Sequence, residues 1–128
     1  DREKLIQAIL NIARNGAQAM KLSNQDNMQL SFVTRAERQI VFRKKKHATA
    51  IRIDIIDNGP GIKNELIDKI FFPLVTGKEN GSGLGLSLSQ NLISLHQGMI
   101  DCHSVPGKTV FSIILPIENN LMPTKEKK

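Results

Sequence analysis

The sequence lacks tryptophan and tyrosine and contains a single cysteine, Cys102. Without a second cysteine the chain cannot form an internal disulfide or a cysteine metal cluster, and a reducing cytoplasm is the expected setting. Aromatic residues make up only 4% of the chain, which leaves little surface for stacking on nucleic-acid bases. No apolar run approaches the roughly 18 residues that span a bilayer, and no charged-then-apolar leader opens the sequence. We therefore expect neither a membrane segment nor a secretory signal.

The composition indicates one soluble globular domain, because 128 residues with 40% hydrophobic and 23% charged side chains suffice for one core. We expect this domain over residues 1–117 and a mobile basic tail over 118–128. The net charge of +6 is concentrated in the tail and in the run Arg43–Lys46. Nucleic-acid contact is one interpretation of these charges, but a solvated hairpin end and a tail explain them more simply. The chain begins without methionine and almost inside a helix, so we expect it to be part of a longer protein.

Hydrophobic periodicity predicts two long helices and several strands. An apolar stripe at helical spacing predicts the first helix, a Gly-rich and charged segment before the second indicates a lid, and Gly98 is expected to end the second helix. In chain order, the sequence predicts a helix over 2–22, strands near 28–34, 39–46 and 50–57, a short helix over 63–70, a helix over about 83–96, and a hairpin of strands near 99–104 and 109–115.

Asp57 stands at the end of the clearest predicted strand. Ile53 and Ile55 alternate with polar residues there, and side chains two positions apart lie on the same face of a strand. The carboxylate of Asp57 should therefore point toward the apolar layer, which is costly unless it finds a partner. A plain Asp-Asn-Gly turn is the simpler interpretation of this motif, but the inward direction argues against it. A fixed carboxylate can accept a hydrogen bond from the exocyclic amine of adenine.

Two asparagines in the first helix also suggest a ligand site. Asn11 and Asn15 are four residues apart and so face the same way, although asparagine is a poor residue for a helix interior. Amide oxygens suit Mg²⁺, which keeps several waters and takes few protein ligands. A solvent-facing polar stripe is the alternative. The functional interpretation makes Asn15 the magnesium ligand and places Asn11 beside phosphates.

Glycines provide the third part of the pattern. Gly59 and Gly61 would let the backbone approach a base closely. Backbone N–H groups around Gly81, Gly83 and Gly85 could face an anion at the start of a helix. No strand precedes this second cluster as a dinucleotide turn requires, and no Gly-Lys-Ser/Thr ending follows as in a P-loop. Two basic residues, either of which could instead be merely solvated, could neutralise phosphate charge: Arg14 and Lys78.

In this order the motifs resemble the catalytic, ATP-binding domain of bacterial two-component sensor histidine kinases. The matching segments cover nearly the whole chain. Their sequences around Arg14–Gly16 and Phe72–Val75 are most similar to those of the nitrogen-regulation sensor kinases. The segments are Gln7–Ala19 (the asparagine box), Asp57–Ile62 (first glycine box), Ile70–Leu74 (phenylalanine box), Gly81–Leu86 (second glycine box), Ser104–Phe111 (closing glycine segment) and Leu115–Pro116 (terminal pair).

The resemblance implies an α/β two-layer fold shared with gyrase, the large heat-shock chaperone and the MutL mismatch-repair protein. This GHKL or Bergerat fold has a mixed five-stranded sheet covered on one face by about three helices, with ATP between helices and lid. The resemblance also implies that Mg²⁺ accompanies the ATP and that four further residues contact the nucleotide: Ile62, Leu84, Leu86 and Thr109. The closing segment lacks a second glycine that many relatives have.

The resemblance further implies phosphoryl transfer from ATP to a histidine on a separate helical dimerisation domain, with Asn11, Arg14 and Lys78 as catalytic residues. None of this chain's three histidines has the context of an acceptor, so the fragment alone should be an inactive monomer while the intact kinase is a homodimer. The implied partners are that domain, a response-regulator receiver domain and a PII-type signalling protein, but not nucleic acid.

Two other classes of function remain open. The first is an ATPase or serine-protein kinase of the same fold. Water-activating relatives carry a glutamate base four positions before the magnesium asparagine, whereas this chain has Asn11 there, and an amide cannot take a proton near neutral pH. The second is a non-catalytic, nucleotide-dependent interaction module, which would predict damaged glycine boxes, whereas both boxes are intact.

Overall fold

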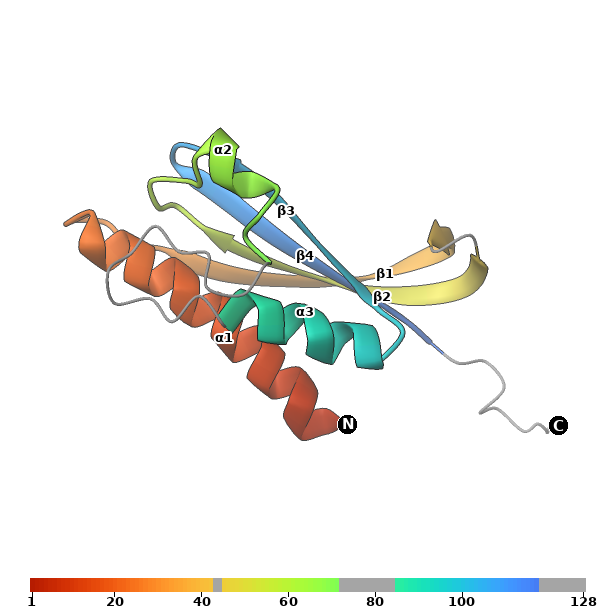
Figure 1. Cartoon of the computed structure of the whole chain (residues 1–128). Coiled ribbons are helices and arrows are strands. Elements are labelled where there is room, and N and C mark those ends of the chain that lie inside the picture. Colours follow the sequence, from red (N-terminus) through yellow and green to blue (C-terminus); the bar gives the residue numbers. More distant parts are fainter. Residues whose placement is uncertain (43–44, 72–84, 118–128) are drawn as a thin grey trace, which may run out of the picture.

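The computed structural model describes residues 1–42, 45–71 and 85–117. Within them, four strands form one sheet in the order β1-β2-β4-β3, with all three neighbouring pairs antiparallel (Figure 1). The two central strands therefore come from opposite halves of the chain. The strands are β1 (Leu30–Phe42), β2 (Lys45–Asp57), β3 (Met99–Val105) and β4 (Lys108–Pro116).

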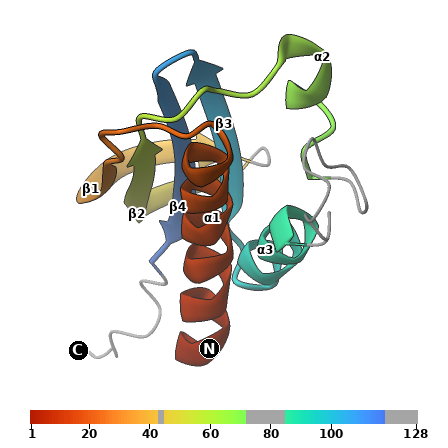
Figure 2. The ribbon, with the colours of Figure 1, turned by 90° about the vertical axis from the view of Figure 1, so that its left-hand side faces the viewer.

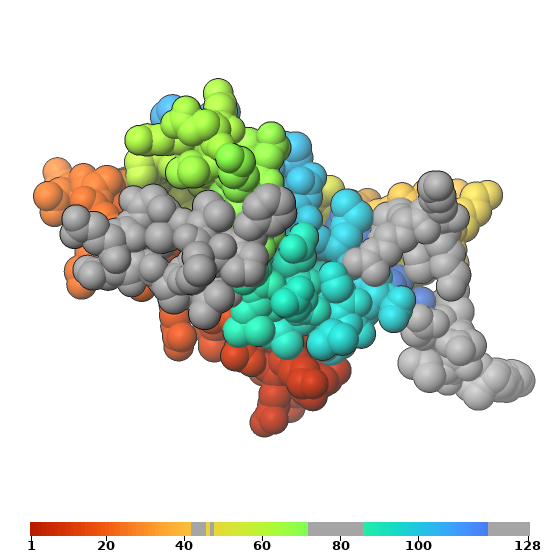
Figure 3. All heavy atoms as spheres, viewed as in Figure 1, coloured from red at the N-terminus to blue at the C-terminus, as the bar shows by residue number. Residues whose placement is uncertain are grey.

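Two helices pack against each other and cover one face of this sheet (Figure 2). They are α1 (Arg2–Leu22) and α3 (Gly85–Leu95), and a single turn, α2 (Asn64–Ile67), lies beyond them near the β3–β4 hairpin. In the space-filling view, α3 covers the middle of the helical face and the α2 region covers the part above it (Figure 3). No helix in the described part of the chain combines the length and apolar character needed to cross a membrane.

The predicted α/β two-layer class is confirmed, but the predicted sheet is wrong in two respects. It has four described strands instead of five, and it is antiparallel instead of mixed. The sequence predicted separate strands near 28–34 and 39–46, with a break between residues 34 and 39. In fact β1 continues through it, with Glu37 paired in register with Ala50 of β2. Glu37 also forms an ion pair with Arg35 at 3.4 Å, so the polar side chains mark an exposed strand.

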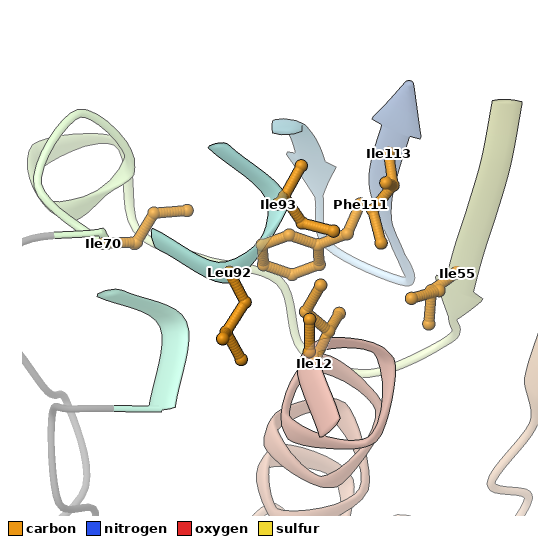
Figure 4. Packing of buried hydrophobic residues seen from close by; sticks show 8 residues of the cluster. Ile12, Ile55, Ile70, Leu92, Ile93, Phe111 and Ile113 are labelled. Carbon is orange, nitrogen blue, oxygen red and sulfur yellow. The ribbon is translucent and has the colours of Figure 1, made fainter. Parts of the chain in front are cut away.

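The core lies between α1, α3 and the inner face of β2 and β4 (Figure 4). Phe111 of β4 is 2% exposed, and its ring meets that of Phe71 edge-on, with centroids 6.2 Å apart. The hydroxyl of Ser89 on α3 donates to the Ala8 carbonyl of α1 at 3.0 Å, which ties the two helices together. The buried cluster consists of Ala8, Ile12, Ile55, Ile70, Leu92, Ile93, Phe111 and Ile113.

Gly98 closes the end of α3, as predicted. The left-handed position that glycine often takes there belongs to Gln97, with φ of 64°. The Gly98 N–H bonds the Ile93 carbonyl and the Gln97 N–H bonds the Ser94 carbonyl, both at 3.0 Å, which is the Schellman arrangement. Position 98 requires glycine for a different reason: a Cβ there would lie 2.6 Å from the Ile114 carbonyl oxygen.

Substitutions at these adjacent positions should therefore have opposite effects. Gln97→Gly should raise the free energy of unfolding by about 0.5–1 kcal/mol, because glycine adopts the left-handed conformation without the steric cost that a residue with a Cβ incurs. Gly98→Ala should lower it by about 1–3 kcal/mol through overpacking. Urea unfolding of both variants and the parent chain measures the two changes. A stabilised Gly98→Ala variant would contradict this description of the helix end.

Candidate functional site

Asp57 lies at the end of β2 with its side chain turned toward the helical layer. It is 7% exposed and follows Ile55, which is 2% exposed, on the same face, as the alternation of the strand predicts. The neighbours across the sheet are Thr109 on β4 and Leu30 on β1. On the helical side the carboxylate meets Gly16 of α1, where a Cβ would come within 2.7 Å of Asp57 Oδ2. Only glycine leaves room for the carboxylate at this point.

The surroundings of Asp57 leave its negative charge poorly compensated. The Gly59 N–H donates to Oδ1 at 2.9 Å, and no cation in the described part of the chain forms an ion pair with the carboxylate. Burial raises the pKa of Asp57, and the hydrogen bond from Gly59 opposes that rise only in part. A neutral donor group placed against this carboxylate would therefore be bound strongly.

The loop after β2 is held against the β3–β4 hairpin by close backbone contacts. The Gly107 N–H donates to the Gly59 carbonyl at 2.9 Å, so the hairpin turn is tied to this loop. Gly61 has φ of +90°, and a Cβ there would lie 2.9 Å from the Val105 carbonyl oxygen. Gly61 is thus required both by its conformation and by this approach, and the loop forms one wall beside Asp57.

A pair of hydroxyl groups extends this wall. Ser104 Oγ accepts a hydrogen bond from the Ile62 N–H at 2.8 Å and lies 2.7 Å from Thr109 Oγ1. Thr109 is 3% exposed and stands opposite Asp57 in the sheet. The structure therefore brings Thr109 of the β3–β4 hairpin together with the continuous segment Asp57–Ile62, which contains the two loop glycines.

The polar residues predicted on α1 lie immediately before Gly16. Asn11 and Asn15 are both half-buried, and Asn15 has an interaction of its own, whereas Arg14 is exposed. Asn15 precedes Gly16, the residue that contacts Asp57, by one position along the helix. The roles predicted for Asn11 and Asn15 toward magnesium and phosphates are not tested by the structure.

Part of the predicted site falls outside the described residues: Lys78, Gly81, Gly83 and Leu84. Gly85 is the first residue of α3, and Leu86 packs against the core as a partly buried side chain. The predicted lid also lies in the segment that is not described. The predictions for these phosphate-side residues are therefore not tested by the structure.

Sequence reasoning overlooked residues that shape the pocket. Gly16 was available as a signal, because glycine inside a helix is unfavourable and marks a close approach. Met20 is 2% exposed and lies against Gly59, where a Cβ would come within 3.0 Å of its Cγ. Met20 belongs to the apolar stripe predicted for the first helix, but nothing in the local sequence points to its contact with Gly59, which is 39 positions away. The hydroxyl of Ser104 was likewise recognisable only once the hairpin was seen against the loop.

Comparisons with known proteins assign the class. The sequence profile described as "Histidine kinase-, DNA gyrase B-, and HSP90-like ATPase" matches residues 1–119. The chain therefore belongs to this ATPase family. The predicted resemblance is confirmed at that level.

Particular relatives narrow the assignment. The chain is 49% identical over 117 residues to the sensory histidine kinase/phosphatase NtrB of Vibrio alginolyticus, and 44% identical to NtrB of Salmonella typhimurium. Each match covers 91% of this chain but 33% of the relative. The chain thus spans about a third of the length of these kinases.

Solved structures agree with the fold. The catalytic domain of histidine kinase ThkA superposes with a TM-score of 0.71 at 27% identity, covering 91% of this chain and 68% of that one. The mycobacterial sensor histidine kinase MprB gives a TM-score of 0.69 at 22% identity, covering 91% of this chain and 74% of that one. At the latter identity the likeness concerns the fold alone.

The contact between Gly16 and Asp57 can be tested through stability. Alanine in place of glycine inside a helix should stabilise by about 1 kcal/mol, but the added Cβ would collide with Oδ2 of Asp57. We expect Gly16→Ala to lower the free energy of unfolding by about 1–2 kcal/mol. In an Asp57→Ala background the same substitution should become neutral or stabilising, which a double-mutant cycle by urea unfolding measures. Equal effects in both backgrounds would show that the two residues do not interact.

The raised pKa of Asp57 predicts a pH dependence of stability. A folded-state pKa above the unfolded value means that stability is full below the unfolded value and is lost as pH rises through the folded one. Asp57→Asn removes this loss and keeps an oxygen for the Gly59 N–H. The stability of the variant relative to the parent should therefore rise from about pH 4 upward and level off once Asp57 is ionised. A relative stability that stays constant with pH would refute the raised pKa.

Proposed function

We propose that this chain binds Mg-ATP and serves as the phosphoryl donor site of a two-component histidine kinase, of the kind that regulates nitrogen metabolism. The observation that carries the proposal is the buried Asp57 carboxylate, which has Oδ1 bonded to the Gly59 N–H and Oδ2 against Gly16. The exocyclic amine of adenine supplies the donor that this carboxylate needs. Guanine presents a carbonyl oxygen at the same position and would be repelled.

The rest of the nucleotide would lie along α1 and at the start of α3. Asn15 suits Mg²⁺ as an amide ligand, and Asn11 would lie beside the phosphates. Backbone N–H groups around Gly81, Gly83 and Gly85 would bind phosphate oxygens, with Lys78 and Arg14 as the neutralising cations. The described residues offer no group of three His, Cys, Asp or Glu for a metal, so a magnesium ion would depend on the amide and on the phosphates themselves. When bound, it would supply neutralisation of phosphate charge.

The chemistry proposed for the intact protein is phosphoryl transfer from ATP to a histidine on a dimerisation domain. The NtrB relatives, which are named as kinase and phosphatase, support this assignment. The share of this domain in catalysis would be positioning and charge stabilisation. Asn11 cannot act as a base that activates water, so hydrolysis of ATP should be slow. In this proposal a cytoplasmic homodimer passes the phosphate to a response-regulator receiver domain, and a PII-type protein is a further partner.

Titration of the chain with Mg-ATP by calorimetry tests the binding proposal. The parent should bind, whereas Asp57→Asn should lose at least tenfold in affinity, because the amide loses the charge-assisted hydrogen bond. Glu3→Gln removes one exposed negative charge near the start of α1, far from Gly16, and serves as the control. It should bind as the parent does. Equal affinities for the parent and Asp57→Asn would remove Asp57 from the site.

A further inference from the structure

Asn58, next to Asp57, is held by the connector between α1 and β1. Its Oδ1 accepts hydrogen bonds from the Gln29 N–H at 2.8 Å and from Gln25 Nε2 at 2.7 Å. Its Nδ2 donates to the Asn27 carbonyl at 2.8 Å, and its backbone N–H donates to the Gln29 carbonyl at 3.2 Å. The Asn58 side chain contacts a backbone N–H and a backbone carbonyl, and these two contacts determine which end of its amide is the oxygen.

Gln25 is the side-chain member of this network. Its Nε2 lies 2.8 Å from the Asn58 carbonyl oxygen and 3.1 Å from the Asn27 carbonyl oxygen, in addition to Asn58 Oδ1. An amide nitrogen carries two N–H donors, so at least one of these hydrogens is shared between two of the three oxygens. Gln25 is half-buried, so the loss of this donor would remove the hydrogen bond to the Asn58 carbonyl oxygen in a partly desolvated place. Asn58 Oδ1 and the Asn27 carbonyl would keep their bonds from the Gln29 N–H and from Asn58 Nδ2.

The end of α1 places Gln25 where it can reach Asn58. Asn24 has φ of 55°, and the Gln25 N–H bonds the Met20 carbonyl at 3.3 Å. This is the same Schellman arrangement that ends α3. The chain therefore turns back at a fixed angle, and Gln25 reaches the backbone and the side chain of Asn58 at once.

The Asn58 carbonyl and the Gly59 N–H belong to one planar peptide group. Gln25 donates to the carbonyl of this group at 2.8 Å, and the N–H of the same group donates to Asp57 Oδ1 at 2.9 Å. We propose that Gln25 is a positioning residue, which acts through Asn58 to fix the direction of the Asp57 carboxylate and so sets the preference for a 6-aminopurine. This inference rests on the proposed function.

A merely structural role would have different consequences. If the network only anchored the connector, its loss would weaken every nucleotide equally, because the loop glycines and the phosphate contacts serve all of them. If the network orients the Asp57 carboxylate, its loss should lower the affinity only for a nucleotide whose base donates a hydrogen bond to Asp57. The preference between two bases that differ in this donor is therefore the informative quantity.

The experiment compares Mg-ATP with the Mg complex of purine ribonucleoside triphosphate, which lacks the 6-amino group, by calorimetry with this chain. Gln25→Ala and Gln25→Met remove the donor, and the second keeps the length of the side chain. Gln29→Ala is the matched control, because Gln29 contacts Asn58 through its backbone alone. Thermal unfolding of each variant verifies that the fold is retained.

We expect the parent and Gln29→Ala to prefer ATP, and both Gln25 variants to lose about tenfold in affinity for ATP while the affinity for the analogue changes less than about twofold. Equal losses for both nucleotides, or an unchanged preference in a folded variant, would overturn the role of Gln25 and leave the proposed function intact. A parent chain that binds neither nucleotide, or shows no preference between them, would overturn the proposed function and this inference with it.

Discussion

The contact between the Asp57 carboxylate and the bare backbone of Gly16 is the constraint on which the site depends. It joins the end of β2 to α1 at a distance that excludes a Cβ at position 16. Because β2 and β4 carry the core residues Ile55 and Phe111, packing of α1 on the sheet brings the helix to the carboxylate. The hydrophobic core thereby desolvates one ionisable group and fixes its neighbours.

Stability and function oppose each other at this point. A buried carboxylate with one backbone donor is unfavourable in the free protein, and its pKa is raised as a consequence. In the proposed function, the adenine amine supplies a second donor to this carboxylate and offsets this cost, which would contribute to the binding free energy. In the wall beside Asp57, the Ile62 N–H and the hydroxyl groups of Ser104 and Thr109 find hydrogen-bond partners within the chain.

Local patterns predicted much of the fold and a part of the site. Alternation correctly gave the inward direction of Asp57, and periodicity gave α1, α3 and the β3–β4 hairpin. The polar run in β1 was misjudged because exposure and loop structure produce the same composition. Gln97 takes the left-handed position after α3, while glycine is required at position 98 because a Cβ there would lie 2.6 Å from the Ile114 carbonyl oxygen of β4. Met20 and Gln25 have partners 33 or more positions away, and no local pattern reports such contacts.

The most direct test is the pKa of the Asp57 carboxyl group, followed by ¹³C NMR of the labelled chain with and without Mg-ATP. The pKa should lie above the ordinary value of 3.8 in the free chain and should fall when the nucleotide binds, because the adenine amine stabilises the charged form. An ordinary pKa in the free chain, or one that ATP leaves unchanged, would contradict the role proposed for Asp57.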